Sequence, residues 1–272
     1  MQIRKLSLLA LCAMSVGGYT TVAAASPAAK AQAHAAKASV APTRAAPDIN
    51  GIWEIYPDPF AGDANTFLEL PVPGNGPKLR EPYASEWKAQ RAKRDAMLKA
   101  GTPLVDPSTQ CIPEGMPAIM GAIFPLQFLQ TPGQVTVLAE FLSQTRRIYL
   151  NKPMPKLDDL TPSYYGMSVG HWEGNTLVVT TTGVKEDVRF FEIPHSPEMT
   201  VTERMRVTGP GLIENDITVN DPKTLLEPYR FTYGYKRNPT YQIMEYYCDR
   251  EDPLFKVKDD GTVEMKHSDE IK

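Results

Sequence analysis

Residues 199–220, MTVTERMRVTGPGLIENDITVN, alternate between apolar and polar side chains on both sides of the turn Gly209-Pro210-Gly211. Because successive side chains of a β-strand point to opposite faces, the alternation predicts two strands that each bury one face, Met199–Val207 and Leu212–Asn220. Glycine and proline between two such runs are typical of a hairpin turn. We therefore expect the domain to be built from hairpins of this kind.

The same succession of strand and turn continues through most of the chain after residue 123. The further expected strands are Asp48–Tyr56, Phe124–Gln130, Gln134–Leu142, Thr145–Asn151, Met167–Trp172, Thr176–Thr182, Tyr229–Lys236 and Gln242–Cys248. The absence of helical patterns between the hairpins excludes a parallel α/β sheet. We predict an all-β, antiparallel up-and-down barrel, which leaves no unpaired edge. A β-sandwich or an open curved sheet is the alternative.

The N-terminal residues have the three parts of a secretory signal peptide. A basic start is followed by an apolar run too short to cross a bilayer and then by small residues. These parts are Met1–Lys5, Leu6–Val16 and Thr20–Ser26. We expect cleavage near Ala24 or Ala25, and therefore a periplasmic or secreted protein. A lipoprotein anchor at Cys12 is the alternative, but Leu11 stands where a small residue is needed.

The rest of the chain shows one change of composition, at the end of an Ala-rich segment that lacks the apolar residues needed for a core. The expected organisation is a signal peptide at 1–25, a low-complexity tether at 26–47, one β domain at 48–252 with a Pro-rich arm at 57–121, and a polar tail at 253–272. Within the arm, one helix is expected to begin at Ser85 and to end before Gly101.

Composition and missing motifs exclude several classes of function. The net charge is -3 at pH 7, and removal of the basic signal peptide makes it more negative, so a nucleic-acid partner is not expected. Nothing after the signal peptide resembles a membrane segment. The chain lacks a G-x-S-x-G elbow, an H-E-x-x-H helix and a Gly-rich phosphate loop. We therefore expect no cofactor and no metal site, while the oligomeric state stays open.

Two cysteines, Cys111 and Cys248, remain after signal cleavage. An even number of cysteines in an oxidising compartment favours a disulfide between them. Two buried free thiols are the alternative.

Glu203 is an acid on the apolar face of its strand, so it needs a cationic partner or a raised pKa. Arg147 is the candidate partner, although its strand allows either face to point inward. Such a pair is either a structural ion pair or a clamp for a ligand carboxylate. His195, in a proline-flanked turn before the Glu203 strand, is either a general acid or base or an ordinary surface residue. Glu203, His195 and Arg147 are the candidate catalytic residues.

Aromatic side chains occupy one face of the strand that begins at Tyr229. They form either ordinary core or a wall for a ring-shaped ligand, with hydroxyl groups available for hydrogen bonds. The candidate ligand-binding residues are these side chains together with Tyr165, namely Tyr165, Tyr229, Phe231, Tyr233 and Tyr235.

A set of short segments between Asp48 and Cys248 carries a family resemblance. They are Asp48–Trp53, Cys111–Pro117, Gln130–Gly133, Arg147-Ile148, Tyr165–Val179, Pro194–Ser196, Glu203-Arg204, Asp221-Pro222 and Glu245–Cys248. In these segments the chain resembles a family of uncharacterised secreted bacterial proteins, and Gly170–Val179, G-x-W-E-G-x-T-L-V-V, is the most specific part.

The resemblance implies a lipocalin-like β architecture, export, and two cysteines that are family features. It implies no reaction. The family commonly has an Asp-Gly-Arg turn after the Arg147 strand, whereas Asn151-Lys152-Pro153 stands here, so no role of that turn is carried over.

Three functions are compatible with these observations. The first is a periplasmic barrel protein that binds a small apolar or aromatic molecule. The second is a cofactor-free isomerase, lyase or hydrolase that acts on such a molecule inside the barrel. The third is an interaction protein of the cell envelope, for which the tether and the arm would be the working parts.

Overall fold

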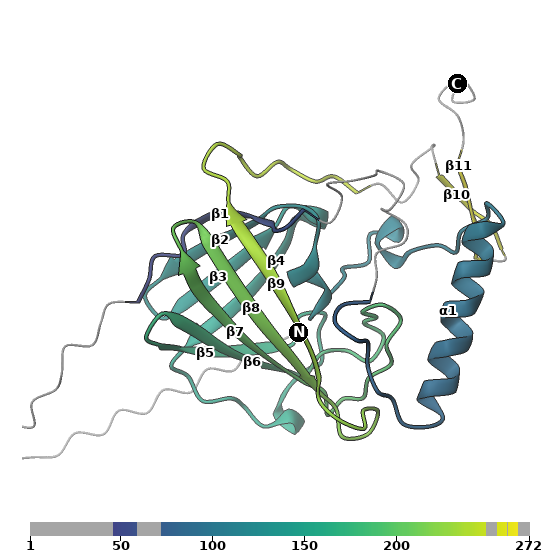
Figure 1. Cartoon of the computed structure of the whole chain (residues 1–272), viewed down its shortest axis with the longest axis horizontal. Helices are drawn as coiled ribbons and strands as arrows, with labels where there is room; N and C mark the ends of the chain where they lie inside the picture. Colours follow the sequence, from purple (N-terminus) through teal and green to yellow (C-terminus); the bar gives the residue numbers. More distant parts are fainter. Residues whose placement is uncertain (1–45, 59–71, 249–254, 260, 266–272) are drawn as a thin grey trace, which may run out of the picture. The chain divides into compact units, whose positions relative to one another are not determined.

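The computed structural model describes residues 46–58, 72–248, 255–259 and 261–265. The expected signal peptide and nearly all of the expected tether lie outside the described residues. Nine strands form a closed barrel in which neighbours follow one another in chain order and β9 pairs with β1 (Figure 1). The strands are β1 (Gly51–Ile55), β2 (Leu126–Thr131), β3 (Gln134–Ala139), β4 (Gln144–Leu150), β5 (Met167–Glu173), β6 (Thr176–Thr182), β7 (Thr200–Gly209), β8 (Leu212–Asn220) and β9 (Tyr229–Arg237). The prediction of an all-β barrel is confirmed.

One pair of neighbouring strands departs from a strict up-and-down order. β4 and β5 are parallel, with Ile148 opposite Ser168, whereas every other neighbouring pair in the barrel is antiparallel. Residues 151–166, which include the short 3-10 helix η5 (Leu157–Asp159), carry the chain back to the end of the barrel at which β4 began. The barrel is therefore mostly antiparallel.

The two ends of the barrel differ in their connections. Tight turns join β2 to β3, β5 to β6 and β7 to β8 at one end. Residues 140–143, 183–199 and 221–228 connect strands at the other end, which we call the loop end. The arm between β1 and β2 also leaves and re-enters the barrel at the loop end. The loop end thus gathers the irregular segments of the domain.

The barrel interior is filled by side chains that the strand alternation directs inward. Trp53, Phe128 and Tyr235 are among the largest side chains without significant exposure. The Trp53 and Phe128 rings meet edge to face at 6.4 Å, and Phe128 meets Tyr235 at 6.5 Å. Aromatic pairs of this geometry add to the free energy that burial of their area provides. The interior is therefore a packed core and not an open channel.

The helix predicted in the arm is present as α1 (Tyr83–Lys99). The carboxylate of Glu81 accepts hydrogen bonds from the backbone N–H and the hydroxyl of Ser85 in its first turn. Trp87 Nε1 donates to the carbonyl of Phe191 at 3.0 Å, and Arg94 pairs with Glu192 at 2.7 Å. These contacts attach α1 to the connection between β6 and β7.

A second part of the arm enters the barrel. Residues 116–121, which we call the plug, include the 3-10 helix η3 (Ala118–Gly121), and Met116, Ile119 and Met120 are at most 1 % exposed. The carbonyl of Met120 accepts a hydrogen bond from Tyr235 Oη at 2.7 Å. Because Tyr235 points into the barrel from β9, the plug occupies the interior at the loop end.

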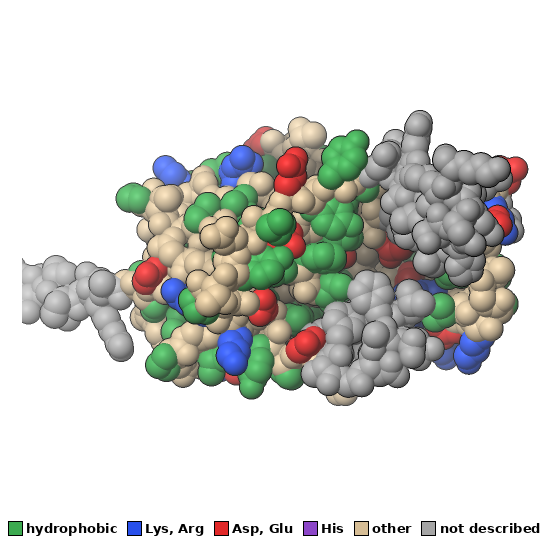
Figure 2. Space-filling view, turned by 90° about the horizontal axis from the view of Figure 1, so that it is seen from above, with side chains coloured by type: hydrophobic (Ala, Val, Ile, Leu, Met, Phe, Trp, Pro, Cys, Tyr) green, Lys and Arg blue, Asp and Glu red, His purple; other side chains and the backbone are tan. Residues whose placement is uncertain are grey.

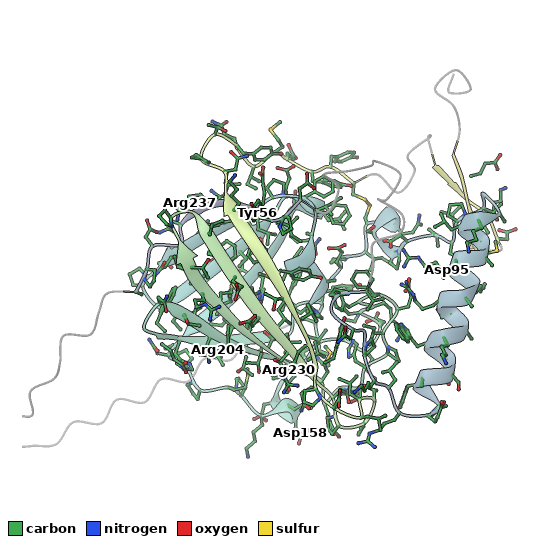
Figure 3. The ribbon with its side chains drawn as sticks, viewed as in Figure 1. Tyr56, Asp95, Asp158, Arg204, Arg230 and Arg237 are labelled. Atoms are coloured by element: carbon green, nitrogen blue, oxygen red, sulfur yellow. A yellow bond between two sulfur atoms is a disulfide. The ribbon has the colours of Figure 1, made fainter. Side chains whose placement is uncertain are left out.

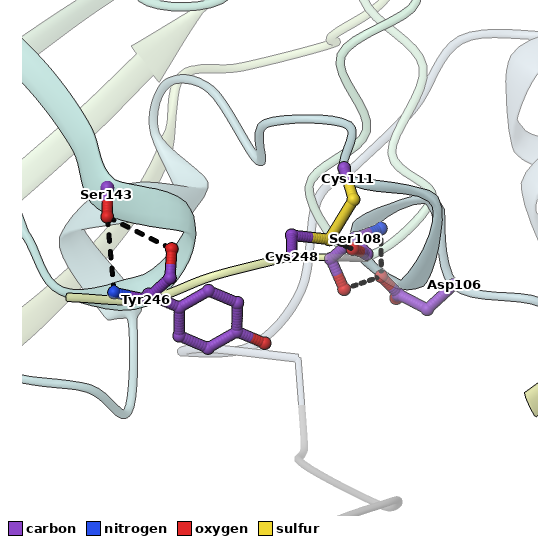
Figure 4. The surroundings of a disulfide bond; sticks show 6 residues. All are labelled: Asp106, Ser108, Cys111, Ser143, Tyr246 and Cys248. Atoms are coloured by element: carbon purple, nitrogen blue, oxygen red, sulfur yellow. Dashed lines mark hydrogen bonds between the residues drawn. A yellow bond between two sulfur atoms is a disulfide. The ribbon is translucent and has the colours of Figure 1, made fainter. Parts of the chain in front are cut away.

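The disulfide between Cys111 and Cys248 is confirmed, and it joins positions 137 residues apart (Figure 4). Cys111 follows the 3-10 helix η2 (Pro107–Gln110), where Asp106 accepts hydrogen bonds from the N–H and the hydroxyl of Ser108. On the other side, Ser143 exchanges hydrogen bonds with the backbone of Tyr246. The bond therefore fastens the arm to the segment that follows β9.

The strand expected at Gln242–Cys248 is wrong. Residues 241–248 are irregular, and the Glu140 carboxylate accepts hydrogen bonds from Tyr241 Oη and from the N–H of Met244. The physical reason is barrel closure, because β1 occupies the edge of β9 that a hairpin partner would need.

Two short strands, β10 (Phe255–Val257) and β11 (Val263–Met265), pair within the expected polar tail. In the part of the chain that the structure describes, no helix combines the length and the apolar character required to span a membrane.

Candidate functional site

Glu203 points into the barrel from β7 and forms a buried ion pair with Arg146 of β4. Its sequence neighbour Arg204 points outward, as does Arg230 on β9 (Figure 3). Both oxygens of the Glu203 carboxylate bind the guanidinium, and Asn215 Nδ2 donates to Oε1 at 3.1 Å. The acid that the strand pattern placed on an apolar face therefore finds a cation inside the barrel.

The remaining donors of Arg146 are also used. The guanidinium donates to Ser168 Oγ at 3.3 Å and to Thr181 Oγ1 at 3.1 Å, and it contacts Met120 Sδ of the plug at 3.2 Å. The Arg146 and Glu203 side chains are 1 % and 0 % exposed, respectively. A ligand carboxylate would have to displace Glu203, so the geometry is that of a structural ion pair.

Arg147, the partner proposed from the sequence, is exposed on the outer face of β4. The β4 side chains that point into the barrel are those of Gln144, Arg146 and Ile148, and all three are buried. Ile148 packs in the hydrophobic core and so directs this face inward. The sequence had left this choice open, and the cation that pairs with Glu203 is the adjacent residue.

His195 lies in the connection between β6 and β7 at the loop end. Its Nε2 is 3.0 Å from the carbonyl of Val188, and its Nδ1 is 3.2 Å from the carbonyl of Ser196. Asp221 anchors this connection by accepting hydrogen bonds from the N–H and the hydroxyl of Ser196. The structure therefore does not bring His195, Glu203 and Arg147 together in one site.

The aromatic face of β9 points inward, and its members have different surroundings. Tyr229 donates to the carbonyl of Pro73 at 2.6 Å, and Phe231 stacks on Phe190 at 5.3 Å. Beside them lies a cavity of about 20 Å³, lined in part by Tyr229 and His195, which has room for about one water molecule. The cavity that Tyr229 lines is therefore too small to admit a ring-shaped ligand.

Tyr233 lies nearer to a second group of polar residues at the loop end. Its ring packs against Gly121 of the plug, where a Cβ atom would stand 2.6 Å from Tyr233 Oη. Burial, together with the nearby charges of Tyr229 and Glu114, raises the pKa of the Tyr233 hydroxyl. Tyr165 is subject to the same influences, because burial and the charge of Glu114 raise its pKa as well. The charge of Glu114 therefore acts on both tyrosines.

The Glu114 carboxyl is the least satisfied polar group of this region. Its Oε2 is enclosed and has no hydrogen-bond partner among the described residues. Burial, with a contribution from the charge of Asp106, raises the pKa of Glu114 to about 7. An acid that is buried without a cation is held closer to its neutral form.

Gly115 explains how Glu114 comes to lie beside Tyr165. At this glycine φ is +73°, and a Cβ atom would stand 2.5 Å from the carbonyl of Tyr164. The absent side chain lets the N–H of Met116 donate to that same carbonyl at 2.9 Å. This hydrogen bond fixes the arm to the segment that leads into β5. Glu114 directly precedes Gly115 in the arm, and Tyr165 directly follows Tyr164 in that segment.

Gln144 joins these residues to a group of three rings. Its Oε1 accepts a hydrogen bond from Tyr165 Oη, and its Nε2 donates to the carbonyl of Phe141 at 3.0 Å. Phe141 stacks on Phe124 with ring centroids 5.1 Å apart, and both meet Tyr246 edge to face. We call the whole set, Glu114, Phe124, Phe141, Gln144, Tyr165, Tyr233 and Tyr246, the loop-end site.

The rings of the loop-end site are partly exposed. Figure 2 shows hydrophobic side chains, with acidic ones among them, gathered on the face of the molecule over which residues 238–248 run. An acidic group next to half-buried rings is suited to hold a molecule that has an apolar body and a polar end. The loop-end site is therefore the better candidate for ligand contact.

The sequence analysis named Tyr165 and Tyr233 of this set as candidates, and it named neither Glu114 and Gln144 nor Arg146 of the buried ion pair. Glu114 lies in Cys111–Pro117, a segment already singled out by its resemblance, so its position was marked although its role was not. Within the described ranges, no group of three or more His, Cys, Asp or Glu side chains is placed to hold a metal ion. No protein-family model matches the chain, and no curated protein matches it significantly.

Proposed function

We propose that this protein is exported to the periplasm and binds a small apolar or aromatic molecule at the loop-end site. The observation that carries the proposal is Glu114 Oε2, which is enclosed and has no hydrogen-bond partner in the part of the chain that the structure describes. Because a buried polar group without a partner is costly, native proteins tend to keep one where a ligand or a proton completes the site.

Two further observations support the location. The mouths of β-barrels are common ligand sites, and the loop end is where the irregular segments of this barrel converge. The deep interior is occupied by the plug and by the Arg146–Glu203 pair. A ligand therefore meets the rings at the loop end before it meets the packed core.

Export is supported by the signal-peptide pattern and by the disulfide. The Cys111–Cys248 bond is of a kind that persists in oxidising compartments and is rare in the cytosol. Fractionation of the source cells tests this part. The protein should appear in the periplasm or medium, shortened near Ala24 or Ala25, whereas a full-length cytosolic protein would contradict it.

Binding is tested with the neutral aromatic probe N-phenyl-1-naphthylamine, whose fluorescence rises in apolar surroundings. We expect saturable binding to the mature protein that weakens at least tenfold in the Phe124→Ala and Tyr233→Ala variants. Tyr247→Ala is the matched control, because this ring is 81 % exposed. Circular dichroism shows whether each variant keeps its fold. Binding that is absent, or that the control changes as much as Phe124→Ala does, would contradict the proposal.

A second candidate function is a cofactor-free enzyme, and one observation favours it. A carboxyl whose pKa is about 7, as for Glu114, is suited to donate and accept protons near neutral pH. In this case Glu114 acts as the acid or base, in place of the candidate catalytic residues Glu203 and His195. Turnover of a bound aromatic compound that Glu114→Gln abolishes, while the probe still binds, would favour the enzyme.

A further inference from the structure

We infer that the ligand of the loop-end site carries a protonated amine on an aromatic body, and that this amine donates a hydrogen bond to Glu114 Oε2. The inference rests on the proposed function and specifies its ligand class. Two observations support it: the hydrogen bonds that the polar groups of the site already make, and the charges that lie around Glu114.

Two polar side chains of the site already bind each other. Gln144 donates one amide N–H to the carbonyl of Phe141, and its own carbonyl accepts the hydroxyl proton of Tyr165. Glu114 Oε2 is an enclosed acceptor of the site that has no donor among the described residues. A ligand that completes this arrangement must therefore supply a donor.

The charge of the surroundings selects a cation among possible donors. Among the described residues, the charge that raises the pKa of Glu114 is that of Asp106, and no Lys, Arg or His of these residues lowers it. Tyr165 and Tyr233, the other titratable groups affected by Glu114, stay neutral near pH 7 because their pKa values are raised. An anionic ligand is repelled by the ionised Glu114 carboxylate, whereas an ammonium group is attracted and offsets part of the cost of desolvating that carboxylate.

The aromatic cluster of the site indicates the apolar part of the ligand. Phe124, Phe141 and Tyr246 provide apolar faces and edges within one cluster. An aromatic body packs against such rings in offset or edge-to-face geometry, and an ammonium is also attracted to ring faces. An arylalkyl amine therefore offers a donor for the carboxyl and an aromatic body for the rings.

Binding of this kind is linked to protonation. Since the pKa of Glu114 is about 7, the carboxyl is mostly neutral at pH 6 and mostly ionised at pH 8. An ammonium ligand binds the ionised form and therefore displaces the Glu114 proton. The affinity for the amine should rise about tenfold from pH 6 to pH 8, which is the change in the ionised fraction.

Three probes with one ring system test the inference. Tyramine carries an ammonium, 4-ethylphenol is neutral and 4-hydroxyphenylacetate is an anion. We measure each by displacement of N-phenyl-1-naphthylamine and by calorimetry in buffers of different ionisation enthalpy. At pH 8 we expect tyramine to bind at least tenfold more tightly than 4-ethylphenol, the anion to bind most weakly, and proton release to accompany tyramine near pH 7.

Glu114→Gln keeps the shape of the side chain and removes its charge. It should abolish the preference for tyramine over 4-ethylphenol, the proton release and the rise in affinity between pH 6 and pH 8. Glu245→Gln is the matched control, an exposed acid next to Tyr246, and it should keep all three effects.

The inference and the proposed function fail in different ways. If Glu114→Gln still prefers tyramine, or if none of the three phenols displaces a probe that binds, the inference is wrong and the binding function stands. If the probe itself does not bind the mature protein, the binding function is wrong as well.

Discussion

At the scale of single residues, the ion pair between Glu203 and Arg146 is closed to water, with both side chains at most 1 % exposed. We predict that Glu203→Gln lowers the free energy of unfolding by roughly 3–5 kcal/mol, because it leaves a buried guanidinium without its counter-charge. Urea denaturation measures the loss. The apolar double variant Arg146→Met with Glu203→Leu should recover most of it, since neither side chain then carries a charge.

A loss below about 1 kcal/mol in the single variant would mean that water or another group compensates Arg146. Failure of the double variant to recover stability would show that the hydrogen bonds to Ser168, Thr181 and Asn215 matter more than the charges. Either result would revise the structural role assigned to the pair.

The same residues show what a strand pattern predicts. Alternation in residues 199–207 placed Glu203 on the apolar face, and that placement is confirmed by its complete burial. In β4 both alternating sets contain one arginine and apolar or aromatic side chains, so the pattern could not choose between Arg146 and Arg147. Glu114 follows no period because it lies in an irregular segment, and the enclosure of its Oε2 atom depends on residues far away in the chain.

At the scale of elements, the plug meets β9 through a glycine. A Cβ atom at Gly121 would stand 2.6 Å from Tyr233 Oη and 2.7 Å from Cζ, closer than such atoms can approach. We predict that Gly121→Ala pushes the Tyr233 ring outward, lowers stability by about 1–3 kcal/mol as overpacking does, and changes the affinity for N-phenyl-1-naphthylamine. Denaturation and probe titration measure the two effects.

Gly209→Ala is the control for this change. At Gly209 an added Cβ atom would meet only Leu212 Cδ1 at 3.9 Å, which is an ordinary contact. If both alanine variants behave like the wild type, then the plug can shift away from Tyr233 and does not fix the shape of the loop-end site.

The hairpins and α1 were predictable because each carries a local period and local turn residues. The plug was not, since proline-rich segments have no period that shows which side chains they bury. The strand expected at Gln242–Cys248 failed for a non-local reason, because β1 pairs with β9 through Trp53, Glu54 and Ile55 and leaves no edge for it. Closure of a barrel is decided by the two ends of a sheet, which a pattern within one segment does not describe.

At the scale of the whole molecule, one covalent bond holds the loop end together. The Cys111–Cys248 disulfide joins the arm, which supplies Glu114 and the plug, to the segment that supplies Tyr246. That segment has no ladder of strand hydrogen bonds and is attached through the side chains of Glu140 and Ser143. Loss of the disulfide should therefore disturb the structure of the loop-end site more than it disturbs the β7–β8 hairpin.

We predict that Cys111→Ser with Cys248→Ser lowers the free energy of unfolding by up to about 5 kcal/mol, the chain-entropy value for a loop of this length. In the native state, hydrogen exchange should accelerate first at the amides of Met244 and Tyr246, which bond to side chains of residues 140–143. Amides within β7 and β8 should keep their protection, because their ladder does not involve the disulfide. Equal acceleration in both regions would instead mean that the barrel and its loop end open as one cooperative unit.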